Sequence, residues 1–160
     1  MLDGTARNSF IQNNIEEGAE GNALGIFIET SSLQVLNGSQ ISSIIDGVGN
    51  SQGIRINSTG NVLFRGSDQR PNGRFTPSAI FAGLSEKGQG NSGDIIIRAN
   101  SLNLEDSSQL SSTTKGQGNA GDIFVIVDEK ALFENSDILS EVTSIDEVDE
   151  GSGGICDVVF

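Results

Sequence analysis

Apolar residues alternate with other residues in four short stretches that recur along the chain. The stretches begin at an isoleucine and carry a second apolar residue two positions further on: Ile26 and Ile28, Ile54 and Ile56, Ile95 and Ile97, Ile123 and Val125. A period of two is typical of a β-strand with one buried face. The pattern therefore predicts four equivalent strands, in which the residues between the isoleucines point outward: Phe27, Arg55, Ile96 and Phe124.

Two further apolar positions recur at fixed distances behind these strands. Counted from the asparagine before each strand, position 13 is Val35, Leu104 or Leu132, and position 19 is Ile41, Leu110 or Ile138. One unit is out of step by one residue and has Val62 and Phe64 in its second strand. Turns such as Leu36-Asn37-Gly38-Ser39 and Glu105-Asp106-Ser107-Ser108 separate the apolar positions. Each unit is thus predicted to contain three short strands.

Gly-Asn pairs mark the units, at Gly21, Gly49, Gly90 and Gly118, and a looser Gly-Ser pair follows at Gly151. The intervals between them are 28, 41, 28 and 33 residues. A unit that buries one position in two makes no core alone, but stacked units do. The predicted fold class is therefore all-β, a right-handed parallel β-helix (β-solenoid) with about five rungs of about 28 residues.

In this interpretation the Gly-Asn pairs are turns stacked at one corner, where both residue types tolerate left-handed backbone angles. Residues 1–160 form a single segment that begins and ends within a rung, as expected for a fragment of a longer solenoid. Cys156 falls on an inward position of the last rung and is predicted to be a small core residue. The open ends of such a stack favour end-to-end self-association.

The interval of 41 indicates an insertion, predicted as a loop at about residues 66–77. Arg70 and Arg74 lie in this loop on an otherwise acidic chain, and loops carry many binding residues. They are candidate ligand-binding residues for an acidic glycan or a protein partner. The alternative is a surface insertion without a ligand.

Asp94 and Asp122 occupy the same place in consecutive units and are predicted to lie on neighbouring rungs. Two carboxylates at that spacing could share a calcium ion, the one cofactor that the sequence suggests. The alternative is that each side chain accepts hydrogen bonds from backbone N–H groups. Gly25 and Gly53 replace the aspartates in the earlier units.

Composition excludes several classes of function. The formal net charge of −13 and the absence of a basic run argue against a nucleic-acid partner. The stretches KGQGNSGDIII, from Lys87, and KGQGNAGDIFV, from Lys115, contain G-x-G-x-x-G, but a strand pattern follows the third glycine where a nucleotide site needs a helix. No nucleotide is therefore expected. There is no histidine, and no residue stands out as catalytic.

The GQGNAGDI motif, followed by an aliphatic strand, a turn and a strand ending in Ser-Ser, resembles the repeats of filamentous haemagglutinin-like exoproteins, particularly those of cyanobacteria. The resemblance covers about residues 16–160. It implies a two-partner secretion system, in which an outer-membrane β-barrel transporter exports a long β-helical adhesin. The export signal would lie outside these residues, and the protein would be secreted or displayed at the cell surface.

The predicted function is accordingly a non-enzymatic stalk or display surface for attachment to a glycan or another cell-surface ligand. A polysaccharide lyase or hydrolase is the alternative from another class, because such enzymes also use parallel β-helices. A surface-layer spacer without a ligand is the third reading. Sequence alone does not separate the spacer from the adhesin.

Overall fold

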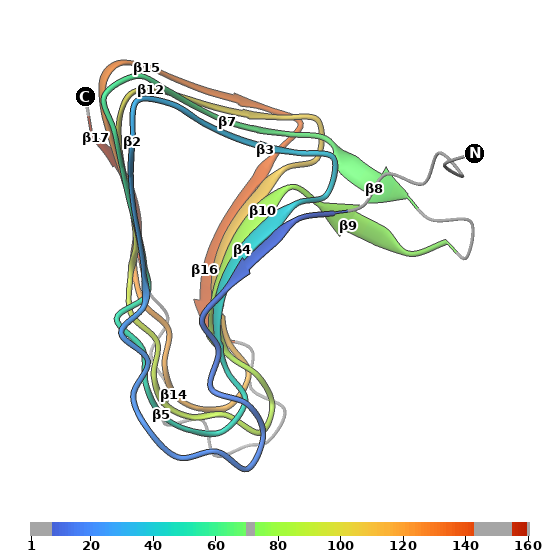
Figure 1. The fold of residues 1–160 in the computed structure, drawn as a ribbon, viewed down its shortest axis with the longest axis vertical. Helices are drawn as coiled ribbons and strands as arrows, with labels where there is room; N and C mark the ends of the chain where they lie inside the picture. Colours follow the sequence, from blue (N-terminus) through green and yellow to red (C-terminus); the bar gives the residue numbers. More distant parts are fainter. Residues whose placement is uncertain (1–7, 70–72, 143–154, 160) are drawn as a thin grey trace.

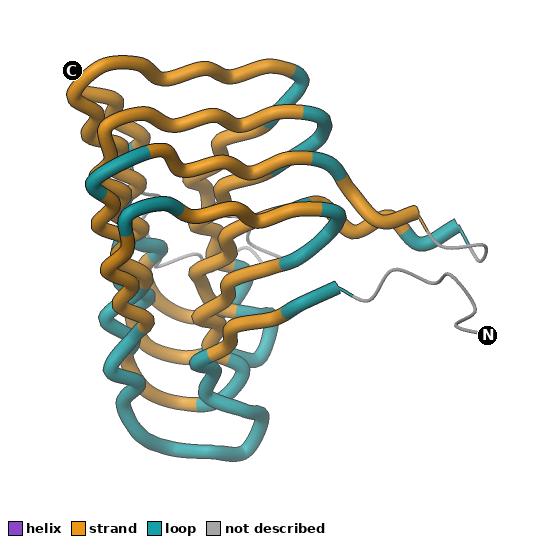
Figure 2. The backbone as a smooth tube through the Cα atoms, turned by 45° about the horizontal axis from the view of Figure 1, so that its top comes forward, coloured by secondary structure: helices purple, strands orange, loops and turns teal. Residues whose placement is uncertain are grey.

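The computed structural model describes residues 8–69, 73–142 and 155–159. Within these ranges the chain is all-β and contains no helix, as predicted. Strands of successive units pair in parallel, one unit beside the next (Figure 2). Parallel neighbours need a long connection, and here each connection runs through the other sheets before the chain returns.

Three parallel sheets contain nearly all of these strands. The isoleucine sheet consists of β2 (Ile26–Thr30), β6 (Ile54–Ser58), β12 (Ile95–Glu105), β15 (Ile123–Glu134) and β17 (Cys156–Val159), with β3 (Leu33–Leu36) and β7 (Asn61–Arg65) beside the second halves of the long strands. The serine sheet consists of β1 (Phe10–Gln12), β4 (Gln40–Ile45), β10 (Ala79–Leu84), β13 (Gln109–Thr114) and β16 (Asp137–Val142). The Gly-Asn sheet consists of β5 (Val48–Asn50), β11 (Gln89–Asn91) and β14 (Gln117–Asn119).

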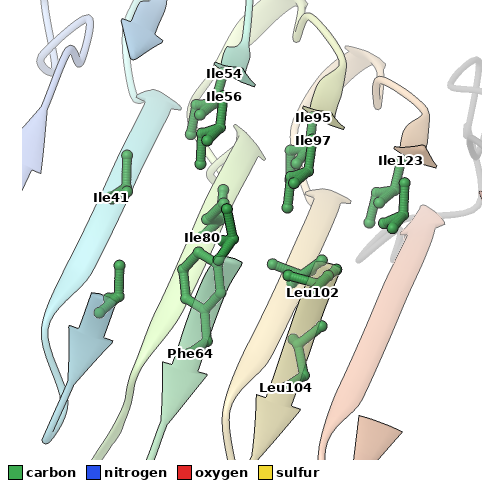
Figure 3. Packing of buried hydrophobic residues seen from close by; sticks show 14 of the residues in the cluster. Ile41, Ile54, Ile56, Phe64, Ile80, Ile95, Ile97, Leu102, Leu104 and Ile123 are labelled. Atoms are coloured by element: carbon green, nitrogen blue, oxygen red, sulfur yellow. The ribbon is translucent and has the colours of Figure 1, made fainter. Parts of the chain in front are cut away.

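The predicted apolar ladders lie in the interior between these sheets. Ile54, Ile95 and Ile123 are Cα partners on adjacent strands and are almost completely buried. The position-19 ladder is also confirmed, because Ile41, Ile80, Leu110 and Ile138 pair in the serine sheet. Phe64 and Leu104 lie beside these isoleucine columns (Figure 3). These residues belong to one main core cluster, and the alternation along each strand accounts for their burial.

A second, smaller apolar cluster lies apart from this main core and consists of Ile15, Ala23, Ile45 and Leu84. Ser43 and Ser112 are buried at equivalent positions of the serine sheet. The Oγ of Ser43 lies 2.7 Å from the Oγ of Ser51, which follows β5. This hydroxyl pair therefore joins the serine sheet to the segment that follows β5, and a larger side chain at either position would hold the two apart.

Two predicted tight turns are confirmed. Ser39 N–H donates to the carbonyl of Leu36, with Asn37 and Gly38 both at positive φ between them. Two successive residues at positive φ define the type I′ turn, which asparagine and glycine adopt readily. In a later unit Asp106 and Ser107 take the same place with φ of 52° and 67°.

Three of the four Gly-Asn pairs, at Gly49, Gly90 and Gly118, differ from the prediction, because they lie in short parallel strands and not in turns (Figure 1). Their glycines have positive φ as predicted, between 132° and 154°, but their asparagines do not. Asn50 instead donates its backbone N–H to the Oδ1 of Asn22 at 3.0 Å, and Asn91 donates to the Oδ1 of Asn50 at 3.0 Å. Asparagine is thus explained by a ladder of side-chain to backbone hydrogen bonds between units.

Leu132 was predicted to face inward opposite Leu104, and this is wrong. One extra residue in β15 shifts the register between Ala99 and Ser101, so that Leu104 pairs with Phe133. Such a bulge moves every later side chain to the other face of the strand. Phe133 is 41% exposed at the described end of the ladder.

The insertion is also different from the predicted loop. Thirteen residues separate β7 from β10, whereas three separate the corresponding strands β3 and β4. They contain a two-stranded antiparallel hairpin, β8 (Ser67–Gln69) and β9 (Phe75–Pro77), which projects from the stack (Figure 1). Ser78 anchors its base, because the buried Oγ donates to the carbonyl of Arg65 and accepts the N–H of Gly38.

Candidate functional site

Asp94 and Asp122 lie on neighbouring units as predicted, immediately before β12 and β15. The Oδ1 of Asp94 accepts the backbone N–H of Asp122 at 2.9 Å, and the Oδ1 of Asp122 accepts the N–H of Ile155 at 2.9 Å. Each aspartate therefore ties its own unit to the next. This arrangement matches the backbone-acceptor alternative, with the N–H supplied by the following unit.

Within the described ranges, no group of three or more Asp, Glu, Cys or His side chains is arranged to hold a metal ion. Each aspartate uses one of its two carboxylate oxygens on the backbone. Calcium prefers six to eight oxygen ligands, so the two remaining oxygens would be a small part of a site. The calcium site stays a hypothesis.

Replacing Asp94 by alanine is expected to lower the free energy of unfolding by about 1 kcal/mol, because the N–H of Asp122 loses its acceptor. Asp94→Asn keeps an acceptor oxygen and should be closer to wild type. Melting temperatures measured in chelator and in calcium distinguish a calcium site from a purely structural hydrogen-bond acceptor. We expect equal melting temperatures; a calcium-dependent rise that Asp94→Asn abolishes would establish a metal site.

Only one of the two predicted ligand-binding arginines of the insertion lies within the described residues. Arg74 is exposed and directly precedes β9, whereas Arg70 lies outside the described residues. Phe75, next to Arg74, is also largely exposed. The two predicted residues are therefore not brought together into a described site.

The glycines of the G-x-G-x-x-G motifs serve close packing of the backbone. Gly90 pairs with Gly49 and Gly118 in adjacent strands, and a Cβ on Gly90 would overlap the carbonyl oxygen of Gly49. Gly93 and Gly121 lead into β12 and β15, so a strand follows where a nucleotide site has a helix. The sequence-based interpretation of these motifs as structural is consistent with this geometry.

Cys156 pairs with Ile123 in the predicted register, but it is exposed and not a core residue. The reason is that β17 is the last described strand of the isoleucine sheet, so no further described strand covers its side chain. Partial burial raises the pKa of the Cys156 thiol, and the Asp122 carboxylate raises it further. Both effects disfavour the thiolate, which is the reactive form.

Sequence reasoning missed a second region, on the outward face of the isoleucine sheet. A depression of about 590 Å³ opens to solvent there, and we call it the Arg55–Arg98 depression. The residues that matter for its chemistry are four charged side chains, one amide and one aliphatic side chain: Glu29, Arg55, Arg98, Asp128, Asn57 and Ile126. They come from β2, β6, β12 and β15, so four successive units build it.

The outward residues of these strands form two rows across the sheet. One row contains Phe27, Arg55, Ile96 and Phe124, which are Cα partners on successive strands. We call it the apolar row, because all its members except Arg55 are apolar. The other row contains Glu29, Asn57, Arg98 and Ile126, which are also Cα partners on successive strands. We call it the polar row, because all its members except Ile126 are polar. Phe27 is 59% exposed, its Cα partner Arg55 is exposed, and Arg98 is exposed on the next strand.

The charged side chains of the depression do not neutralise one another in pairs. In the described part of the chain, Arg55 and Arg98 form no hydrogen bond or ion pair, in contrast to Arg65, whose guanidinium lies 3.9 Å from Glu105. Both guanidinium groups are exposed and are therefore available to another molecule. The Oδ1 of Asn57, in contrast, is shielded from solvent and accepts no hydrogen bond.

Comparisons with family models, curated proteins and solved structures gave no match to this chain. The described residues contain no helical segment of the length and apolarity that a membrane-spanning helix requires.

Proposed function

We propose that this chain is a segment of a right-handed parallel β-helix and serves as the stalk or display surface of an exported attachment protein. The observation that carries the proposal is the in-register parallel pairing of successive units in three sheets. Such stacking gives an elongated body whose side chains line up in rows on each outer face. A stalk needs this regular elongation, and an attachment surface needs repeated contact rows.

The resemblance of GQGNAGDI and its copy to filamentous haemagglutinin-like repeats supports the same proposal. In that family an outer-membrane transporter is the export partner, and the folded solenoid is displayed outside the cell. For this chain, a secreted or cell-surface location and a transporter partner are parts of the proposal. The acidic surface of the chain favours a solvated, extended protein.

Adhesion of beads tests the proposed function. Beads carrying the folded chain are expected to be retained under flow on at least one biological surface among mucin, extracellular matrix and polysaccharide films. Beads carrying a chain unfolded by the substitution of a core residue are the control. Equal retention of both would show that the adhesion is non-specific, and no retention of either would favour a spacer. Cleavage of a polysaccharide film would favour an enzyme.

A further inference from the structure

We propose that the Arg55–Arg98 depression binds a neutral polysaccharide. The inference rests on the proposed attachment function and assigns a ligand class to one face of the display surface. It starts from the position of the depression, which crosses four units on a face whose backbone groups are already paired within the sheet. Only side chains are available there, so they decide what is bound.

The polar side chains present both donors and acceptors. Arg55 and Arg98 supply guanidinium N–H donors, Glu29 and Asp128 supply carboxylate acceptors, and the amide of Asn57 supplies a further N–H donor. A sugar hydroxyl donates one hydrogen bond and accepts others, so adjacent hydroxyls match a mixed set of this kind.

The apolar row lies directly beside these groups. Phe27 and Arg55 are Cα partners, as are Arg55 and Ile96, which places an exposed aromatic ring and an aliphatic side chain on either side of the guanidinium. A pyranose ring has an apolar C–H face as well as its hydroxyl edge. Binding sites commonly combine apolar and aromatic surface with a few directed polar groups. The two rows together provide that combination.

Charge argues for a neutral ligand over an acidic one. Glu29 and Asp128 offset Arg55 and Arg98 within the depression, and the whole chain carries a formal charge of −13. A polyanion would be repelled by the field of the protein during approach. An extended peptide is disfavoured for another reason, because strand addition needs a free sheet edge and this surface is a sheet face.

Affinity gel electrophoresis tests the inference with soluble polysaccharides cast into the gel. The probes are hydroxyethylcellulose, galactomannan and arabinoxylan as neutral polymers, and alginate and dextran sulfate as anionic polymers. We expect at least one neutral polymer to retard the chain, at low and at high salt alike. Arg98→Ala and Arg55→Ala should each weaken this binding about tenfold, because a charge-assisted hydrogen bond is lost.

Arg65→Ala is the matched control, because it removes the same charge from an exposed arginine that lies outside the depression. Circular dichroism checks that all three variants fold. Retardation by anionic polymers alone, or equal binding by Arg98→Ala and wild type, would overturn the inference. Failure of every neutral polymer would also overturn it. If beads still adhere to mucin or matrix in that case, the attachment function stands with another ligand, such as a protein.

Discussion

Gly90→Ala is expected to destabilise the fold by about 4 kcal/mol, which is a large part of the stability of a typical domain. Gly90 has a φ of 132°, and a Cβ at this position would overlap the carbonyl oxygen of Gly49 in the neighbouring strand. The obstructing atom belongs to the backbone, so no side-chain rotation relieves the overlap. The two units would have to separate locally, and the parallel pairing of β5 and β11 would weaken.

Gly18→Ala is the control, because Gly18 also has a positive φ, 78°, but no atom lies within 4 Å of the added Cβ. It isolates the conformational cost of about 1 kcal/mol from the cost of the overlap. Urea denaturation followed by circular dichroism gives both values. Equal effects of the two substitutions would mean that the strands of the Gly-Asn sheet do not approach as closely as described.

Phe64→Ala is expected to cost about 3 to 5 kcal/mol and to leave the chain largely unfolded at moderate urea concentrations. Phe64 is completely buried in the main core and pairs with Val35 and Leu104 on the adjacent strands. Figure 3 places its ring beside the isoleucine columns. Removal of the ring leaves a cavity in a core made otherwise of aliphatic side chains.

The exposed Phe27 provides the matched control. Phe27→Ala removes the same atoms from an outward position of β2 and should change the free energy of unfolding by less than about 1 kcal/mol. Both variants are measured by urea denaturation at one protein concentration, so that self-association does not differ between them. A large effect at Phe27 with a small one at Phe64 would reverse the assignment of the two faces.

Much of the interior could be predicted from sequence because the same physical constraint recurs in every unit. Ile26, Ile54, Ile95 and Ile123 pair in the predicted register, and so do Ile41, Leu110 and Ile138 with Ile80 between them. A buried strand face demands apolar residues at every second position, and stacking repeats that demand at a fixed interval. Each unit therefore tests the interpretation of the others.

Local irregularities were not predictable in the same way. The extra residue in β15 leaves no compositional mark, because both Leu132 and Phe133 are apolar and either could be placed inward. The asparagines of the Gly-Asn sheet are common turn residues, and their side-chain hydrogen bonds depend on a neighbouring unit 28 or 41 residues away. The hairpin in the insertion was likewise not predicted, because Pro71 and Pro77 are typical of loops and the pairing of β8 with β9 is not evident from the sequence.

The candidate site was hidden because its residues come together only through the stacking. Arg55 and Arg98 are 43 positions apart in sequence, yet they lie on adjacent strands about 8 Å apart, two residues along from one another. The signal in the sequence was the set of outward residues between the isoleucines, where Phe27, Ile96 and Phe124 are unusually apolar for a solvated face. Their significance follows only from the rows that they form.

The stacking of units in register is the central claim, and a distance between spin labels tests it most directly. Phe27→Cys and Asp157→Cys, in a Cys156→Ser background, place labels at the two ends of one outward row. Four strand spacings separate these positions, so their backbone separation is predicted to be about 19 Å. A narrow distribution consistent with this separation would support the stack. A broad distribution, or one centred at a much longer distance, would contradict it.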